Sequence, residues 1–190
     1  MRAEDEATRS RLAQDPTFWH GYHPQMRRVH RRNGDRLDAI FDDVGRWPGF
    51  ALVGLEGSEA AWFIANHDIA SPAIMHRSRE LMATAVDEGE ASATLLAYLT
   101  DRIASFERGH QLYGTQLGWD DAGNFTIWPP LTDPDRVDQR RQRVGLGILA
   151  DPVSQPGTDA ARPTRMSQED LDALRRGELD FITSVGWRAS

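Results

Sequence analysis

Apolar residues three and four positions apart recur along most of the chain, and this spacing constrains the fold more than any other sequence feature. The clearest case is the segment 92–107, where Leu95, Leu99, Ile103 and Phe106 fall on one face of a helix. The same kind of pattern, with its start and stop signals, predicts further helices at about 2–14, 24–44, 58–67, 71–87, 133–144 and from 167 onward. We therefore expect a mainly α protein, a compact bundle of about five or six helices with one small β-hairpin.

The hairpin is expected near 112–128. Tyr113, Thr115 and Leu117 alternate with glycine and glutamine on the way in, and the run 125–128 is rich in β-forming residues. Between them lies an Asp/Gly/Asn cluster at 120–124 that is typical of a turn. The segment 45–57 is expected to be a turn and a short extended or loop segment, with Ser58 as the N-cap of the following helix.

The same signals predict the domain organisation. Residues 1–150 are expected to form a single helical domain that includes the hairpin. Residues 151–166 contain three prolines together with Ser, Thr, Gly and Asp, which predicts a linker. Residues 167–190 are expected to form a helical tail that either folds back on the domain or binds a protein partner.

Composition excludes several kinds of chemistry. The chain has no cysteine, and all 22 basic residues are arginine, so thiolate metal sites, cysteine nucleophiles and lysine-based catalysis are excluded. The net charge is −7 and no long basic stripe is present, which argues against nucleic acid as a partner. No apolar run is long enough to span a membrane, and the charged start of the chain does not look like a signal peptide, so a cytoplasmic protein without membrane contact is expected.

Several polar residues lie where the helical spacing predicts a buried face. His30 and Asn33 fall on the apolar stripe of the second predicted helix, either as a buried pair bonded to the backbone or as site residues facing a pocket. Arg102 lies between Leu99 and Phe106 on an apolar face. Because a buried arginine needs a partner, we expect Arg102 to face a carboxylate, a carbonyl group or a ligand anion.

Histidines offer only weak indications of a metal. His20 and His23 have a compatible spacing, but two histidines in a loop are an unspecific signal. A site at His67 and Asp68 would need His30 or His76 to converge on them, and nothing in the spacing requires this. His67 could equally interact with the C-terminus of its own helix. No metal site is predicted, and the sequence identifies no cofactor.

Several blocks of the chain resemble an uncharacterised bacterial family, a domain of unknown function that is frequent in actinobacterial genomes. The most specific block is the Q-x-Y-G-T-Q run at 111–116, and weaker blocks include the Trp-Pro-Gly of 47–49 and the Leu-Thr-Asp-Arg-Ile of 99–103. The resemblance covers about 22–149 and implies one coherent domain without a settled activity. Its hallmark positions here are mostly polar: His30, Asn33, His67, Asp101, Arg102, Gln111, Tyr113, Thr115, Gln116 and Arg141.

These residues lead to a first hypothesis of a small enzyme with a polar pocket between helices and hairpin. Arg102, together with Arg141, would hold a carboxylate or phosphate, because a guanidinium forks onto such groups. His67 or His30 would be the acid or base, and Asp101 would orient a histidine or the substrate. Hydrogen bonds would come from Asn33, Gln111, Tyr113, Thr115 and Gln116. Hydrolysis, elimination or isomerisation would suit this equipment, since none of them needs a redox cofactor.

Two other hypotheses remain open at the level of sequence. The same pocket could belong to a non-catalytic module that binds a peptide or an anionic small molecule, with the tail at 167–190 recruiting a protein. Alternatively, the polar residues could form a closed structural network in which Arg102 is paired with a carboxylate and no pocket exists.

Overall fold

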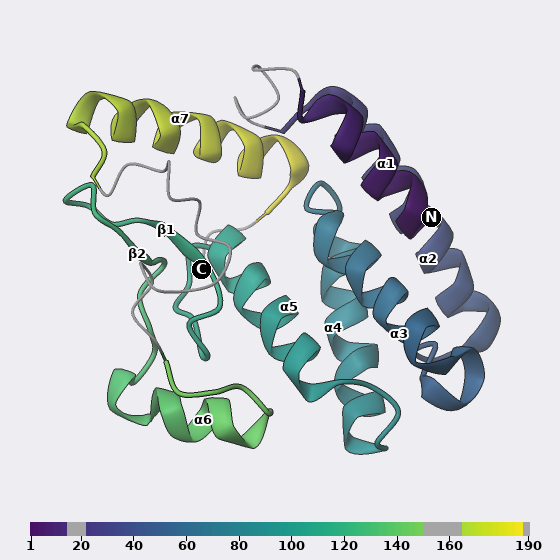
Figure 1. Cartoon of the computed structure of the whole chain (residues 1–190). Coiled ribbons are helices and arrows are strands. Elements are labelled where there is room, and N and C mark those ends of the chain that lie inside the picture. Colours follow the sequence, from purple (N-terminus) through teal and green to yellow (C-terminus); the bar gives the residue numbers. More distant parts are fainter. Residues whose placement is uncertain (15–21, 150–164, 188–190) are drawn as a thin grey trace. The chain divides into compact units, whose positions relative to one another are not determined.

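The computed structural model describes residues 1–14, 22–149 and 165–187, and within these ranges the protein is mainly helical with one small antiparallel hairpin, which confirms the predicted fold class (Figure 1). The chain forms two compact units, Met1–Leu99 and Thr100–Ser190. The boundary falls within α5 (Ala93–Phe106). Most of the predicted linker and His20 lie outside the described residues.

In the first unit, the long helix at Pro24–Val44, α2, is in contact with three other helices. The helices that precede α5 are α1 (Arg2–Leu12), α2 (Pro24–Val44), α3 (Phe50–His67) and α4 (Pro72–Asp87). Both α1 and α4 pack against α2 and α3. The centre of this unit is apolar, with Leu37, Phe41, Trp47, Met75 and Met82 almost completely buried. The predicted helices at 2–14, 24–44 and 71–87 are thus found within a few residues of their expected ends.

The prediction of a loop over 45–57 was wrong from residue 50 onward. Helix α3 begins at Phe50 and continues past a kink at Gly54, where φ is 72°. The carboxylate of Glu90 accepts a hydrogen bond from Ala51 N, and the Glu90 carbonyl accepts one from Phe50 N. These acceptors satisfy amides that a helix start leaves open, and they come from a residue 39 positions away in sequence.

Ser58 is therefore not an N-cap. It is buried inside α3, where its hydroxyl accepts a hydrogen bond of 3.0 Å from the indole N–H of Trp47. The indole of Trp47 would otherwise carry a buried, unsatisfied donor. Ser58 thus satisfies a buried donor in the core of the first unit, and the prediction that it begins a helix was wrong.

The second unit contains the hairpin. Strands β1 (Leu117–Trp119) and β2 (Phe125–Ile127) pair antiparallel, with Gly118 opposite Thr126. The hairpin is shorter than predicted, because residues 111–116 form a loop with side-chain hydrogen bonds of its own. A 3-10 turn, η2 (Pro134–Arg136), leads into α6 (Val137–Arg143), close to the helix predicted at 133–144.

The predicted tail forms one helix, α7 (Gln168–Val185), which runs through Gly177 without a break. The Ser167 hydroxyl caps its start by accepting from Asp170 N. Within the second unit, Leu171, Ile182 and Trp187 are buried, and the ring of Phe106 stacks on Trp187 at 5.3 Å. The tail therefore folds onto its own unit, while its role as a protein-binding element stays a prediction. In the described ranges, none of the helices combines the length and apolar character of a membrane span.

Replacement by alanine is expected to have opposite effects on stability at Gly34 of α2 and at Gly177 of α7. A Cβ atom at Gly34 would lie 1.9 Å from Oδ2 of the buried Asp68, whereas a Cβ at Gly177 meets nothing within 4 Å. We expect Gly34→Ala to lower the free energy of unfolding by about 3 kcal/mol through this clash. Gly177→Ala should raise it by about 0.5–1 kcal/mol through helix propensity. Urea unfolding followed by circular dichroism measures both, and equal effects would contradict the packing around Asp68.

Candidate functional site

Three ionisable side chains from three different helices meet in the first unit. Asp5 comes from the buried side of α1, His30 from the apolar stripe of α2, and His67 from the last turn of α3. Asp5 and His30 are 2% and 4% exposed, whereas the side chain of His67 is 20% exposed. The cluster is thus buried on two sides and reaches solvent only through His67. We call these three residues the Asp5 cluster.

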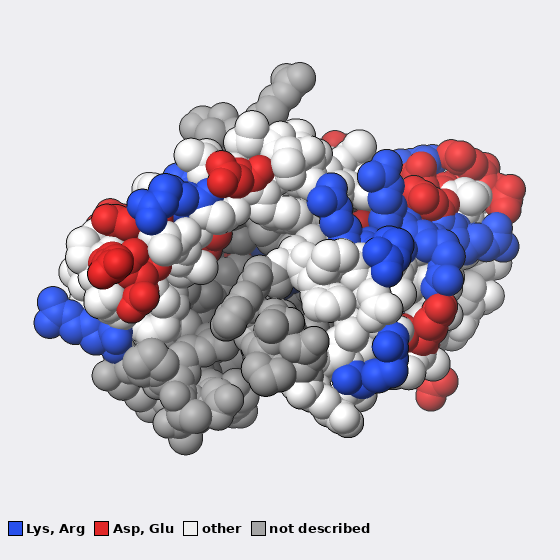
Figure 2. Space-filling view, turned by 90° about the horizontal axis from the view of Figure 1, so that it is seen from above, with Lys and Arg blue, Asp and Glu red and all other residues white. Residues whose placement is uncertain are grey.

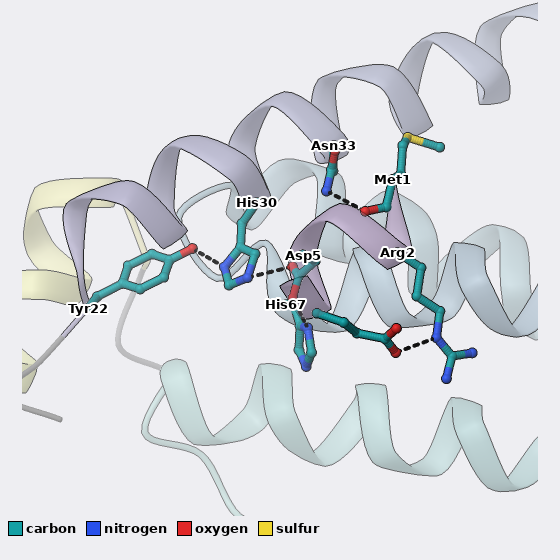
Figure 3. A network of polar contacts seen from close by, with 8 residues as sticks. Met1, Arg2, Asp5, Tyr22, His30, Asn33 and His67 are labelled. Atoms are coloured by element: carbon teal, nitrogen blue, oxygen red, sulfur yellow. Dashed lines mark hydrogen bonds and ion pairs between the residues drawn. The ribbon is translucent and has the colours of Figure 1, made fainter. Parts of the chain in front are cut away.

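The distances within the Asp5 cluster are short (Figure 3). Nε2 of His30 lies 2.7 Å from Oδ2 of Asp5, and Nδ1 of His67 lies 3.8 Å from Oδ1 of the same carboxylate. On the other side of the His30 ring, Nδ1 is 2.7 Å from the hydroxyl of Tyr22. The result is a row of groups, Tyr22–His30–Asp5–His67, in which the carboxylate bridges two imidazole rings.

Electrostatics keep the carboxylate of Asp5 ionised. Burial by itself would raise the pKa of Asp5, but hydrogen bonding and charge interaction with His30 and His67 outweigh it and hold the pKa well below its usual range. A buried negative charge is stable only where positive charge or donors surround it. The Asp5 cluster therefore favours a positively charged occupant between the carboxylate and the two rings.

A second buried carboxylate follows directly in sequence. Asp68 is completely buried, and burial raises its pKa to about 6 against the opposing effects of Ser71 and His30. Only a glycine at position 34 leaves room for it. Asp68 and the Asp5 cluster together give this unit an unusual density of buried titratable groups, a feature that is common at functional sites.

One arginine, Arg2, lies near the exposed edge of His67, and its guanidinium is ion-paired with Glu6 at 2.9 Å. The ring of Phe63 packs edge-on against His67 at 4.0 Å, and the guanidinium of Arg2 lies 5.2 Å from the centre of the Phe63 ring. Figure 2 shows basic and acidic side chains intermixed on this part of the surface, and Arg32 of α2 is likewise paired with Glu4 of α1. An anionic molecule that approaches His67 would therefore have to compete with Glu6 for Arg2.

The structure brings together only some of the predicted site residues. His30 and His67 lie in one cluster, and Asn33 is buried next to it on α2, where its amide donates to the Met1 carbonyl at 3.5 Å. Asp5 was missed by the sequence reasoning, which treated the first helix only as charged. The available signal was its spacing from Leu12, which places a carboxylate on the one apolar side of that helix.

The other predicted residues lie in the second unit, where Asp101 organises the loop 111–116. The Asp101 carboxylate is completely buried and accepts hydrogen bonds from the backbone N–H groups of Leu112, Tyr113 and Thr115, at 2.8–3.2 Å. It also accepts one from the Thr115 hydroxyl. Burial raises the pKa of Asp101, and these donors oppose the shift. The observed partners of Asp101 are thus backbone amides of the Q-x-Y-G-T-Q block.

The remaining polar groups of this block are also bonded within the unit. Gln111 is buried and bridges Gln116, donating to its carbonyl and accepting from its N–H, and it donates to Pro129 O as well. The guanidinium of Arg141 donates to the carbonyls of Tyr113 and Gly147. Arg140 donates to the Leu112 carbonyl in the same way.

Arg102 is half-buried, with its guanidinium 5.9 Å from the centre of the Phe106 ring. Three of the residues expected to bind substrate instead form hydrogen bonds within the protein itself: Gln111, Thr115 and Arg141. The loop 111–116 is therefore a rigid element whose donors and acceptors are largely used by its own unit.

The chain belongs to a family of unknown function (DUF6624), whose sequence profile matches residues 5–156. This confirms the resemblance seen in the sequence. The match begins at Asp5 and ends before α7, so it includes every residue of the Asp5 cluster and the Asp101 loop. No curated protein and no solved structure shows significant similarity to the chain.

The hydrogen bonds of Asp101 predict a structural effect of its removal. Asp101→Ala would leave three partly buried backbone amides without an acceptor, and we expect a loss of about 2–3 kcal/mol in the stability of the second unit. Asp101→Asn keeps one acceptor oxygen and should cost less. Hydrogen exchange at residues 112, 113 and 115 should accelerate strongly in the alanine variant.

Asp120 provides the matched control for this prediction. Its carboxylate also accepts from two backbone amides, those of Ala122 and Asn124, but in an exposed turn. Asp120→Ala should accelerate exchange only in that turn and leave the loop 111–116 unchanged. Unaltered exchange at 112–115 in Asp101→Ala would show that the carboxylate does not hold the loop.

Proposed function

We propose that this member of the DUF6624 family is a small enzyme whose reaction centre is the Asp5 cluster. The reaction would be a hydrolysis, elimination or isomerisation that needs no redox cofactor, and the substrate would carry a carboxylate or phosphate group. The observation that carries the proposal is the convergence of Asp5, His30 and His67 from three helices on one partly accessible point.

The burial of these groups supports a functional role. Placing a carboxylate and two imidazoles in a protein interior costs more than packing apolar residues of similar size there. The first unit has a well-packed apolar core around Phe41 and Trp47, so stability alone gives no reason for a polar cluster beside it. Such arrangements of buried, interacting ionisable groups are typical of reaction centres.

Access and charge indicate where a substrate would lie. Only His67 among the three is exposed to a substantial degree, so a substrate would approach the cluster along the edge of this ring. Arg2, held over Phe63, would exchange its exposed ion-pair partner Glu6 for an anionic group of the substrate. The proposal thus assigns anion binding at the Asp5 cluster to Arg2, whereas Arg102 and Arg141, which the sequence suggested for this role, belong to the second unit.

The roles of the residues follow from their positions. Asp5 orients both imidazoles and stabilises positive charge between them, and the Tyr22 hydroxyl fixes the ring of His30 from its other side. The neutral imidazole of His67 would accept a proton from a water molecule or substrate carbon at its exposed edge, and the Asp5 carboxylate would stabilise the imidazolium that forms. The imidazolium would then return the proton to the leaving group or product.

Replacement of His67 tests this proposal. A panel of phosphate esters, carboxylic esters and β-substituted carboxylates is incubated with the wild-type protein to find a turnover. We expect His67→Gln to lower kcat/KM for the active compound by about 10²–10⁴-fold, the usual contribution of an acid–base group. Arg2→Ala should chiefly raise KM, since it removes a binding contact outside the reacting atoms.

His76→Gln is the matched control, because His76 is a half-buried histidine of α4 in the same unit that is not part of the cluster. It should retain full activity. Circular dichroism and thermal unfolding show whether each variant is folded. Wild-type activity in a folded His67→Gln variant, or no turnover of any compound in the panel, would refute the proposal.

One observation favours the alternative of a binding module. The second unit has a pocket of about 480 Å³ between the end of α5, the hairpin and α7, a volume typical of small-molecule sites. It is lined by aromatic residues such as Trp119 and Trp128, and the guanidinium of Arg175 lies 5.2 Å from the centre of the Trp128 ring. An aromatic carboxylate would match the apolar walls, and its carboxylate would replace the exposed Asp121, which lies 2.7 Å from Nη1 of Arg175.

This alternative predicts binding without turnover. Indole-3-acetate and benzoate serve as probes, with tryptophan fluorescence and calorimetry as measurements. Arg175→Ala should weaken binding at least about 10-fold, because it removes the charged partner of the carboxylate, whereas Arg176→Ala on the exposed side of α7 should not. Absence of binding by either probe would speak against the module.

A further inference from the structure

We propose that Asp5, His30 and His67 form a binding site for a divalent transition-metal ion, with Zn²⁺ as the expected ion. The inference deepens the proposed function, because it identifies the positive charge that the cluster would hold. Only the catalytic role of the metal rests on the proposed function. The binding of the metal itself can be tested without a substrate.

The geometry suits three-point coordination. One ligand atom from each of the three side chains lies within 4.8 Å of the other two. In a tetrahedral zinc site with bonds of about 2.0–2.1 Å, neighbouring ligand atoms are about 3.4 Å apart. The distance of 3.8 Å between Asp5 Oδ1 and His67 Nδ1 is close to this value, and the 2.7 Å between Asp5 Oδ2 and His30 Nε2 needs a small opening.

The carboxylate of Asp5 has bonding capacity left. Its Oδ1 atom is buried and has no donor within hydrogen-bond distance among the described residues, and Nδ1 of His67 lies 3.8 Å away from it. A buried, ionised oxygen without a donor is costly, and such atoms commonly indicate an ion or water at that place. This oxygen lies on the side of the carboxylate that points to His67, which is the side that solvent reaches.

The surroundings of His30 point in the same direction. Nε2 of His30 and Oδ2 of Asp5 are too close to face each other with two lone pairs. Either Nε2 carries a hydrogen that it donates to Asp5, or the two atoms move apart to bind a metal ion in place of that hydrogen. The Tyr22 hydroxyl at Nδ1 is the kind of outer partner that metal-binding histidines have, because it fixes the tautomer and the ring orientation. With Nδ1–H donated to Tyr22, the lone pair of Nε2 is available to a metal.

The set of ligands selects the type of ion. Two imidazole nitrogens and one carboxylate oxygen suit zinc and related transition metals, whereas Mg²⁺ and Ca²⁺ prefer oxygen ligands only. Three protein ligands leave a fourth position, and the partial exposure of His67 places it towards solvent. This is the arrangement of catalytic zinc sites, in which the metal lowers the pKa of a bound water and so supplies a nucleophile.

Calorimetric titration with Zn²⁺ tests the inference. The full chain is treated with a chelator, dialysed and titrated with ZnCl₂. We expect one equivalent to bind with a Kd in the micromolar range or below. Asp5→Asn and His67→Gln each remove one of three ligands and should weaken binding at least about 100-fold, while Tyr22→Phe removes only the outer partner and should weaken it about 10–100-fold.

His76→Gln and His23→Gln serve as matched controls and should bind Zn²⁺ like the wild type, since neither residue belongs to the cluster. If a ligand variant does not fold, the wild type loaded with Co²⁺ still decides the question, because a visible spectrum of tetrahedral cobalt with nitrogen and oxygen ligands reports the site directly. An absence of stoichiometric binding in the wild type, or equal affinity in Asp5→Asn and the wild type, would overturn the inference.

The two proposals fail separately. Zinc binding that depends on Asp5 and His67, without turnover of any compound in the panel, would support the metal site and refute the enzyme. Full turnover by chelator-treated protein that also fails to bind Zn²⁺ would overturn the metal site and leave the enzyme. Activity that is lost on chelation and restored by Zn²⁺ would support both.

Discussion

The carboxylate of Asp5 is buried on α1 and lies against imidazoles from α2 and α3, and the packing of these three helices depends on how its charge is compensated. An ionised carboxylate in a protein interior is tolerated only with donors or cations around it. The first helix, which otherwise buries little besides Leu12, is therefore tied to the unit by a polar contact. A proton or a metal ion shared by the three side chains would link stability and chemistry at the same point.

In the second unit, a buried carboxylate is stabilised by a different kind of partner. Asp101 is as deeply buried as Asp5, but its partners are backbone amides of the loop 111–116, and Arg140 and Arg141 bind carbonyls of the same loop. The block that most clearly marked the family resemblance thus uses much of its polarity on its own backbone. A polar block of this kind can meet the hydrogen-bonding needs of an irregular loop as well as those of a ligand.

The helices were largely predictable because their signals are local. Apolar spacing, the proline after His23 and the left-handed Gly45 define α2 within a few residues. The start of α3 was not predictable in this way, since its first amides are satisfied by Glu90, far away in sequence. The hairpin was placed correctly but drawn too long, because the alternation at 113–117 belongs to a loop that Asp101 holds in place.

The order of amino acids already implies a mainly helical protein without thiol or lysine chemistry, because helix periodicity and composition are local properties of the chain. It also marks His30 and His67 as candidates, since polar residues on apolar faces stand out. The meeting of these histidines with Asp5, and the separate use of Asp101, depend on how helices pack across long sequence separations. No local pattern encodes such contacts, because each helix supplies only one of the residues in contact. Which helices pack together depends on the fold as a whole.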